Sequence, residues 1–205
     1  MMTHIRSLTQ DRSGSTAAEF AMVLPLLILF LLGIIDAGRL MWTLNQTEKA
    51  AQMGARMAVA TDMIPNGLYT MDYSATLGQG ANIPTDSTGF GSAKCQKPGS
   101  TVTCTCVSNC PTLTPIKSAA FDAIVTRMNK ISPMILASNV TITYTNSGLG
   151  YAGDPNGADV SPLISVAIDG LSFKPLITQF FGISFALPVI DSTLTTEDGE
   201  GNVSN

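Results

Sequence analysis

Apolar positions in this chain are concentrated in one long block near the N-terminus. About sixteen residues between Glu19 and Asp36 carry no charge, and nearly all of them are apolar. This run is shorter than the roughly 20 residues that a bilayer core requires, but small and apolar residues on both sides extend it. Residues 15–42 are therefore predicted to form a transmembrane helix, with Trp42 at the outer interface, where an amphipathic ring is favoured.

Helix-forming sequence continues beyond the predicted span. Residues 43–62 are rich in Ala and Met, and the next proline is Pro65. From residue 15 to residue 61 the helix would measure roughly 70 Å, about twice the thickness of a bilayer core, so half of it should project outward. We expect a sheet to pack against a strip of small residues on this outer half: Ala50, Ala51, Gly54, Ala55 and Ala58.

The remainder of the chain predicts a loop-rich region followed by a helix and strands. Residues 63–115 are rich in Gly, Ser, Thr, Asn and Pro and show little periodicity, so they predict loops. Residues 116–196 contain patterns of helical and alternating period. They predict a helix over 116–131, strands over 140–145, 163–169 and about 188–196, and a loop over 146–159. The fold class is therefore α+β with a small antiparallel sheet, and the tail, 197–205, is predicted to be disordered.

Four cysteines lie within the predicted loop region: Cys95, Cys104, Cys106 and Cys110. An even number of cysteines downstream of a membrane helix favours two disulfides in an oxidising compartment. Zinc is the alternative, but the spacing lacks a Cys-x2-Cys knuckle and no histidine is nearby. Of the three connectivities, the one that joins Cys104 to Cys106 is disfavoured because so tight a ring is strained. We expect the disulfides to staple a long irregular loop.

The first residues of the chain are basic and predict its orientation. Arg6, Arg12 and the α-amine face a single acid, Asp11. Positive charge beside a span favours the cytoplasmic side, so the N-terminus is predicted to be cytoplasmic and the C-terminal domain periplasmic. A secretory signal peptide is the alternative. The apolar run is long for a signal core and continues without a break into more helix-forming sequence, which weighs against it.

A glycine and a carboxylate stand five positions apart where the apolar run begins. The segment reads Gly14-Ser-Thr-Ala-Ala-Glu19-Phe20, followed by Ala-Met-Val-Leu-Pro-Leu. This layout resembles the TadE/TadG-like pseudopilins, or minor pilins, of the tight-adherence (Flp, type IVb) pilus system. Residues 50–56, Ala-Ala-Gln-Met-Gly-Ala-Arg, are similar to the Ala-Ala-Arg-x-Gly-Ala-Arg segment of those proteins, although the first Arg is absent here.

The resemblance implies a processing site and a role for the carboxylate. A prepilin peptidase would cleave after Gly14, remove the leader 1–14 and leave Ser15 as the new N-terminus. Glu19 would then be the fifth mature residue, and it would pair with the Ser15 ammonium of a neighbouring subunit inside a bundle of helices. A carboxylate at the edge of the hydrocarbon is costly, and such acids usually mark function. Without that spacing, a glutamate that stays hydrated among the headgroups would be the simpler interpretation.

Pro25 lies inside the predicted span. It removes one backbone hydrogen bond, so a kink or local unwinding is expected. Membrane helices also tolerate proline without any functional consequence, whereas the resemblance implies local melting of this helix on assembly. Both interpretations stay open.

Composition and charge exclude several classes of function. The net charge of −4 and the pI near 4.8 argue against a nucleic-acid partner, which needs a basic patch. The only histidine, His4, lies in the leader, so the mature chain has no Ser-His-Asp or Cys-His nucleophile. Calcium at Asp154, Asn156 and Asp159 is an alternative, but their spacing does not match an EF-hand loop. We expect no enzyme, no cofactor and no metal.

Two functions follow from these patterns. The first is a single-pass subunit of the bacterial inner membrane, or of an extracellular pilus, that assists pilus assembly, adhesion and biofilm formation. Its partners would be the prepilin peptidase, the other Tad/Flp pilus subunits, the inner-membrane assembly platform and the lipid bilayer. The second is a bitopic periplasmic binding protein with a disulfide-stapled loop and no pilus role.

Overall fold

The computed structural model describes residues 13–85, 89–155, 157–179 and 182–196. Most of the predicted leader and the whole predicted tail therefore lie outside the described residues. The chain divides into two compact units. The helical unit comprises the chain up to Trp42 together with residues 173–185, and the sheet unit comprises residues 43–172 and the chain from Ala186 onward.

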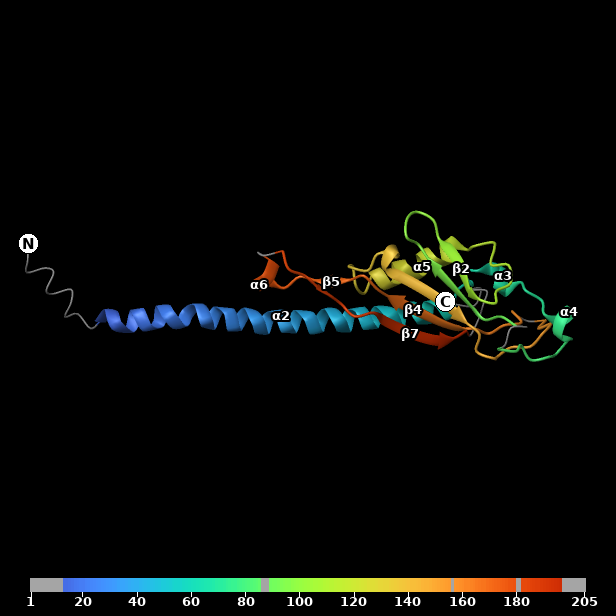
Figure 1. The fold of residues 1–205 in the computed structure, drawn as a ribbon, viewed down its shortest axis with the longest axis horizontal. Helices are drawn as coiled ribbons and strands as arrows, with labels where there is room; N and C mark the ends of the chain where they lie inside the picture. The colour runs from blue at the N-terminus through green and yellow to red at the C-terminus, as the bar shows by residue number, and fades with distance from the viewer. Residues whose placement is uncertain (1–12, 86–88, 156, 180–181, 197–205) are drawn as a thin grey trace, which may run out of the picture. The chain divides into compact units, whose positions relative to one another are not determined.

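One long helix, α2, forms the N-terminal part of the described chain (Figure 1). It runs from Ser13 to Val59, 47 residues, or roughly 70 Å. The helix passes through Pro25 and ends two residues before the predicted end, a difference within the usual uncertainty of helix termini. The predicted continuous helix, about twice as long as a bilayer core is thick, is confirmed.

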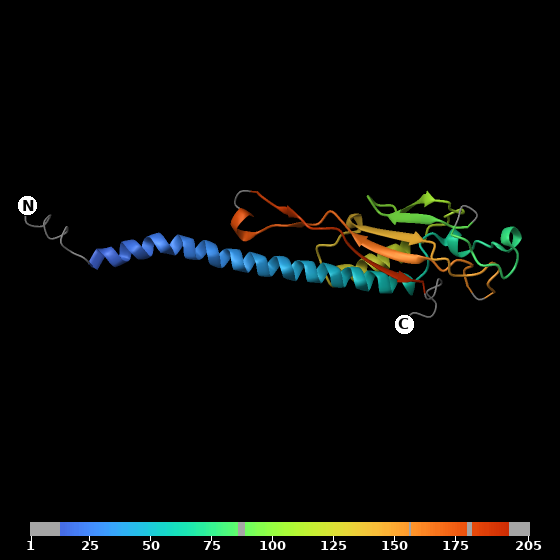
Figure 2. The same ribbon diagram turned by 60° about the horizontal axis from the view of Figure 1, so that its bottom comes forward.

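A five-stranded antiparallel sheet forms the centre of the sheet unit (Figure 2). The strand order is β2-β1-β3-β4-β7. The bounds are Ser92–Gln96 for β1, Thr103–Ser108 for β2, Val140–Thr145 for β3, Leu163–Ile168 for β4 and Ile190–Thr195 for β7. Strands β3, β4 and β7 occupy the three segments in which the sequence predicts strands, so the α+β class is confirmed.

Strands β1 and β2 correct the prediction of loops over residues 63–115. Strand β1 buries only two small side chains, Ala93 and Cys95. Strand β2 is an edge strand of Thr, Cys, Val and Ser whose side chains are mostly exposed. Neither strand shows an alternation of large apolar residues, because neither has to fill a core. The same region also contains two single-turn helices, α3 at Asn66–Tyr69 and α4 at Ser74–Leu77.

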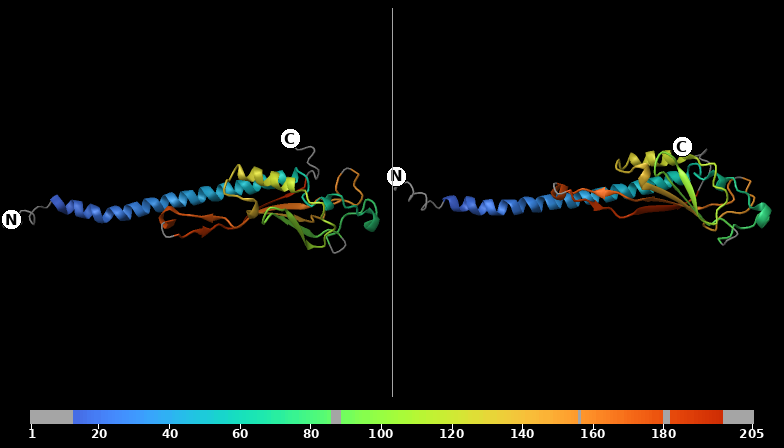
Figure 3. Two further views of the ribbon diagram at one scale, coloured as in Figure 1. Left: turned by 90° about the horizontal axis from the view of Figure 1, so that it is seen from above. Right: turned by 45° about the horizontal axis from the view of Figure 1, so that its top comes forward.

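Two helical segments cover one face of the sheet (Figure 3). They are the last part of α2, from Thr43 to Val59, and α5, which spans Ser118–Asn129. The predicted strip of small residues makes this packing possible, since Ala50, Ala51 and Ala55 are completely buried. At Gly54 an added Cβ would lie 2.6 Å from Met128 Sδ and 3.2 Å from Val166 Cγ1. The approach of α5 and β4 to α2 therefore favours a glycine at this position, because a larger residue would displace Met128 and press on Val166.

A short hairpin precedes the last strand of the sheet. Strands β5 (Ser172–Phe173) and β6 (Phe185–Ala186) pair with each other, and helix α6 (Leu176–Gln179) lies between them in the sequence. Residues 173–185 belong to the helical unit. A single 3-10 turn, η1 at Ala137–Asn139, leads into β3.

Candidate functional site

The N-terminal half of α2 presents an apolar surface that the protein itself does not cover. An 18-residue window of this helix has a mean hydropathy of 2.6, and none of it is buried. Phe20, Leu26 and Phe30 are each more than 60% exposed. Contiguous apolar surface of this extent is unusual on a soluble monomer and marks a membrane or protein contact. Among the described residues α2 is the one helix that could cross a membrane, as expected for a single-pass membrane protein.

The predicted processing site lies at the very start of α2. Gly14 and Ser15 already have helical backbone, while the first twelve residues of the leader are outside the described part of the chain. Glu19 follows on the same helix and is exposed. Residues four apart lie one above the other on a helix, so the backbone places Ser15 and Glu19 on the same face, one turn apart.

Pro25 falls six residues after Glu19, within the apolar surface. Because proline has no N–H, the carbonyl of Ala21 lacks its intrahelical partner. In hydrocarbon such an acceptor is costly unless a neighbouring helix or a local adjustment satisfies it. The helix is continuous at Pro25. Whether the proline is simply tolerated or marks a point where the helix melts on assembly is not tested by this structure, and both stay predictions.

A buried carboxylate follows the apolar run directly. Asp36 is only 7% exposed, in contrast to its apolar neighbours on the helix. Its Oδ1 accepts a hydrogen bond from the backbone N–H of Leu176 at 2.9 Å, and its Oδ2 accepts one from the N–H of Ile177 at 3.3 Å. The guanidinium of Arg39 donates to Oδ1 at 2.9 Å. Asp36 therefore fixes α6 to α2 within the helical unit.

Arg39 extends the same connection by one further contact. Its guanidinium carbon lies 5.4 Å from the centre of the Phe173 ring, a distance typical of a cation–π interaction. The sequence places an acid and a base three residues apart at the end of an apolar run, and this spacing predicts the ion pair between Asp36 and Arg39. The partners on α6 are 140 residues away, so the sequence gives no indication of them.

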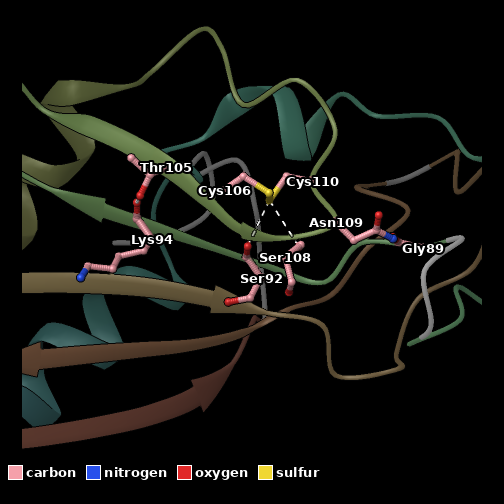
Figure 4. Close-up of a disulfide and its surroundings, with 8 residues drawn as sticks. All are labelled: Gly89, Ser92, Lys94, Thr105, Cys106, Ser108, Asn109 and Cys110. Carbon is pink, nitrogen blue, oxygen red and sulfur yellow. Dashed lines mark hydrogen bonds between the residues drawn. A yellow bond between two sulfur atoms is a disulfide. The ribbon is translucent and has the colours of Figure 1, made fainter.

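Two disulfides are present, as the even number of cysteines predicts. Cys95 and Cys104 are directly opposed on β1 and β2, with Cα atoms 4.0 Å apart. Cys106 and Cys110 close the end of β2 (Figure 4). The disfavoured pairing of Cys104 with Cys106 does not occur. The expectation of a stapled irregular loop is wrong, because the first bridge joins two paired strands.

In the loop that holds the candidate calcium ligands, the carboxylate of Asp159 binds backbone N–H groups of the protein. Asp159 is buried and accepts hydrogen bonds from the N–H groups of Tyr73 at 2.7 Å and Asp154 at 3.0 Å. Burial and the charge of Asp159 together raise the pKa of Tyr73. Asn156, the third candidate calcium ligand, lies outside the described residues. Within the described ranges no group of three or more His, Cys, Asp or Glu is placed to hold a metal ion.

The fold and this site define a class: an α+β protein built on one apolar helix that is long enough to cross a membrane and to project beyond it. Residues 14–56 match the family model described as TadE-like protein. The matched segment includes Gly14, Glu19, Asp36 and the strip of small residues except Ala58. Over this segment the chain is similar to TadE-like proteins. Comparisons with curated proteins and with solved structures found no match.

Proposed function

We propose that this protein is a pseudopilin or minor pilin of the bacterial inner membrane that assists assembly of a tight-adherence pilus. The TadE-like segment supports an association with that pilus system. The single observation that carries the proposal is the position of Gly14 and Glu19 at the start of one uninterrupted, uncovered apolar helix. In this account a prepilin peptidase cleaves after Gly14, and α2 then packs among the helices of other pilus subunits.

Glu19 is the residue that sets the register of packing. Cleavage after Gly14 leaves an ammonium on Ser15, one helical turn from Glu19. A carboxylate that enters a helix bundle without a partner pays a large desolvation cost, and a neighbouring ammonium offsets most of it. A subunit therefore docks most stably when its Glu19 meets the Ser15 amine of the next subunit. The sheet unit is on the periplasmic side, where it is presented to other subunits or to a surface during adhesion.

The experiment replaces Glu19 in the native host and counts pili. Glu19→Gln keeps the shape of the side chain and removes its charge, so we expect loss of pili or of incorporation while membrane insertion is unchanged. Glu48→Gln is the matched control, because Glu48 is an exposed carboxylate on the same helix but in the sheet unit. Normal piliation with Glu19→Gln would refute the pairing.

A substitution at Gly14 separates the proposal from the rival function. An anchored binding protein does not depend on cleavage and should tolerate a blocked site. A pseudopilin with an uncleaved leader should fail to assemble although it still enters the membrane. The readout is again the number of pili, with the membrane content of the protein measured by immunoblot.

A further inference from the structure

The segment from Phe173 to Phe185, named here the apolar hairpin, has the composition of a membrane-contacting element. It contains four of the eight phenylalanines of the chain and a single charged residue, Lys174. Leu176, Ile183 and Phe185 are large apolar side chains on its described part, and all three are exposed. Apolar side chains that stay in water do not stabilise the fold by burial. Their gathering on one short hairpin therefore indicates a surface that another molecule covers.

Asp36 sets the level of the apolar hairpin along α2. At 1.5 Å per residue, the helix rises about 24 Å between Phe20 and Asp36, and a bilayer core is about 30 Å thick. If the hydrocarbon begins near Phe20, it ends near Arg39. The hydrogen bonds from Leu176 and Ile177 to Asp36 therefore hold α6 at the boundary between hydrocarbon and headgroups.

The charges near the hairpin fit this level. The carboxylate of Asp36 is buried under three donors and thus does not face lipid as a bare charge. Lys174 has an exposed side chain long enough to reach the headgroups while its stem stays among apolar groups. Trp42, exposed three residues after Arg39, stands where interfacial tryptophan is favoured.

We propose that the apolar hairpin is an interfacial membrane anchor that inserts Leu176, Ile183 and Phe185 into the leaflet at the C-terminal end of the span. The occupant of this surface is lipid, because the hairpin continues the same apolar unit as the uncovered helix and is tied to it at the boundary. The proposal rests on the proposed membrane span of α2. It adds a second contact with the bilayer, one that would restrain rotation of α2 about its axis.

Fluorescence quenching in liposomes tests the anchor with the full chain. Trp42 is the only tryptophan, so Trp42→Phe gives a background into which one tryptophan at a time can be introduced. The three test positions are Ile183→Trp on the hairpin, Phe30→Trp in the span and Val107→Trp on the exposed edge strand β2. The quenchers are phosphatidylcholine brominated near the headgroup end of its acyl chains and, in water, acrylamide.

We expect Ile183→Trp to be quenched by the brominated lipid and shielded from acrylamide, and Val107→Trp to show the reverse. The anchor is overturned if Ile183→Trp behaves like Val107→Trp. The span still stands in that case if Phe30→Trp is shielded from acrylamide. Exposure of Phe30→Trp to acrylamide would instead refute the span itself. Ile183→Trp that is shielded from both quenchers shows a protein cover and also overturns the proposal.

Substitution of Asp36 tests the tether separately. In the Ile183→Trp background, Asp36→Ala removes both acceptors for the N–H groups of α6. We expect quenching by the brominated lipid to fall and acrylamide quenching to rise, while Phe30→Trp with the same substitution stays shielded. Unchanged quenching of Ile183→Trp would show that Asp36 does not hold the hairpin at the membrane.

Discussion

Tyr144 on β3 is completely buried, and its hydroxyl accepts a hydrogen bond from the backbone N–H of Ile64 at 3.1 Å. This bond joins the segment after α2 to the centre of the sheet. Burial raises the pKa of Tyr144, because the charged phenolate would be poorly solvated there. The residue thus contributes to stability through its neutral hydroxyl, which satisfies the buried N–H of Ile64.

Replacement of Tyr144 by Phe should destabilise the sheet unit by about 1–3 kcal/mol, because the N–H of Ile64 would remain buried without an acceptor. The measurement is denaturant unfolding of the detergent-solubilised protein, followed by near-ultraviolet circular dichroism. Tyr151→Phe, at an exposed tyrosine, is the control and should have a smaller effect. Equal losses in the two variants would contradict this role of the Ile64 bond.

The raised pKa of Tyr144 also predicts a dependence on pH. In the unfolded chain a tyrosine ionises near pH 10, whereas in the folded protein Tyr144 stays neutral to higher pH. Its contribution is therefore complete below about pH 10 and is lost as the pH rises toward the folded pKa. Tyr144→Phe should flatten this alkaline loss of stability. A wild-type curve and a Tyr144→Phe curve of the same slope above pH 10 would be inconsistent with the shift.

Gly54 offers a second test at the scale of one residue. A methyl group there would meet Met128 and Val166, so Gly54→Ala should cost about 1–3 kcal/mol through overpacking, less if Met128 moves aside. Gly38 is on the same helix and has open space around it. Gly38→Ala should be neutral or stabilising by up to about 1 kcal/mol, the helix propensity difference. The free energy of unfolding of the two variants is measured in detergent. A loss for Gly54→Ala alone shows the packing effect, whereas similar values for both variants show that helix propensity dominates.

At the scale of elements, the first disulfide reinforces an edge. Strand β2 is one of the two edge strands of the sheet and its side chains are mostly exposed, so burial contributes little to its pairing with β1. Because Cys95 and Cys104 are opposed in the pairing register, their bridge adds a covalent link to the β1–β2 pair.

Removal of the two bridges should differ in cost. Cys95→Ser with Cys104→Ser should destabilise the sheet unit by about 2–4 kcal/mol. The bridge between Cys106 and Cys110 closes a loop about half as long, so its removal should cost about 0.6 kcal/mol less. The two double variants are compared by denaturant unfolding without reductant. A larger cost for the shorter loop would contradict the loop-length argument.

The elements that the sequence predicts are those whose periodicity reflects burial. Helix α5 and strand β3 each alternate between a buried apolar face and a polar one, and β4 alternates between buried and half-buried positions. The bounds of all three agree with prediction to within a few residues. Strands β1 and β2 lack that signal because their buried residues are small or few. The contact of Asp36 with α6 depends on the tertiary fold, and no local pattern in the sequence encodes it.

At the scale of the whole molecule, the sequence predicts the separate apolar helix and sheet-packing region better than it predicts individual contacts. The uncharged run after Glu19 predicts the uncovered helix, and the small residues around Gly54 predict where the sheet packs. The proposed processing site also rests on a sequence pattern, a glycine five residues before a glutamate. Its use depends on a peptidase that must recognise the first residues of the chain.

Prepilin processing is the central claim of this account. It is tested most directly by the intact mass and the N-terminal sequence of the protein purified from membranes of its native host. We predict a mature chain that begins Ser-Thr-Ala-Ala-Glu, with residues 1–14 removed. A chain that retains the leader would contradict the claim and favour an anchored binding protein. Cleavage near Ala37 would show that the N-terminus is a secretory signal and that α2 does not remain in the membrane.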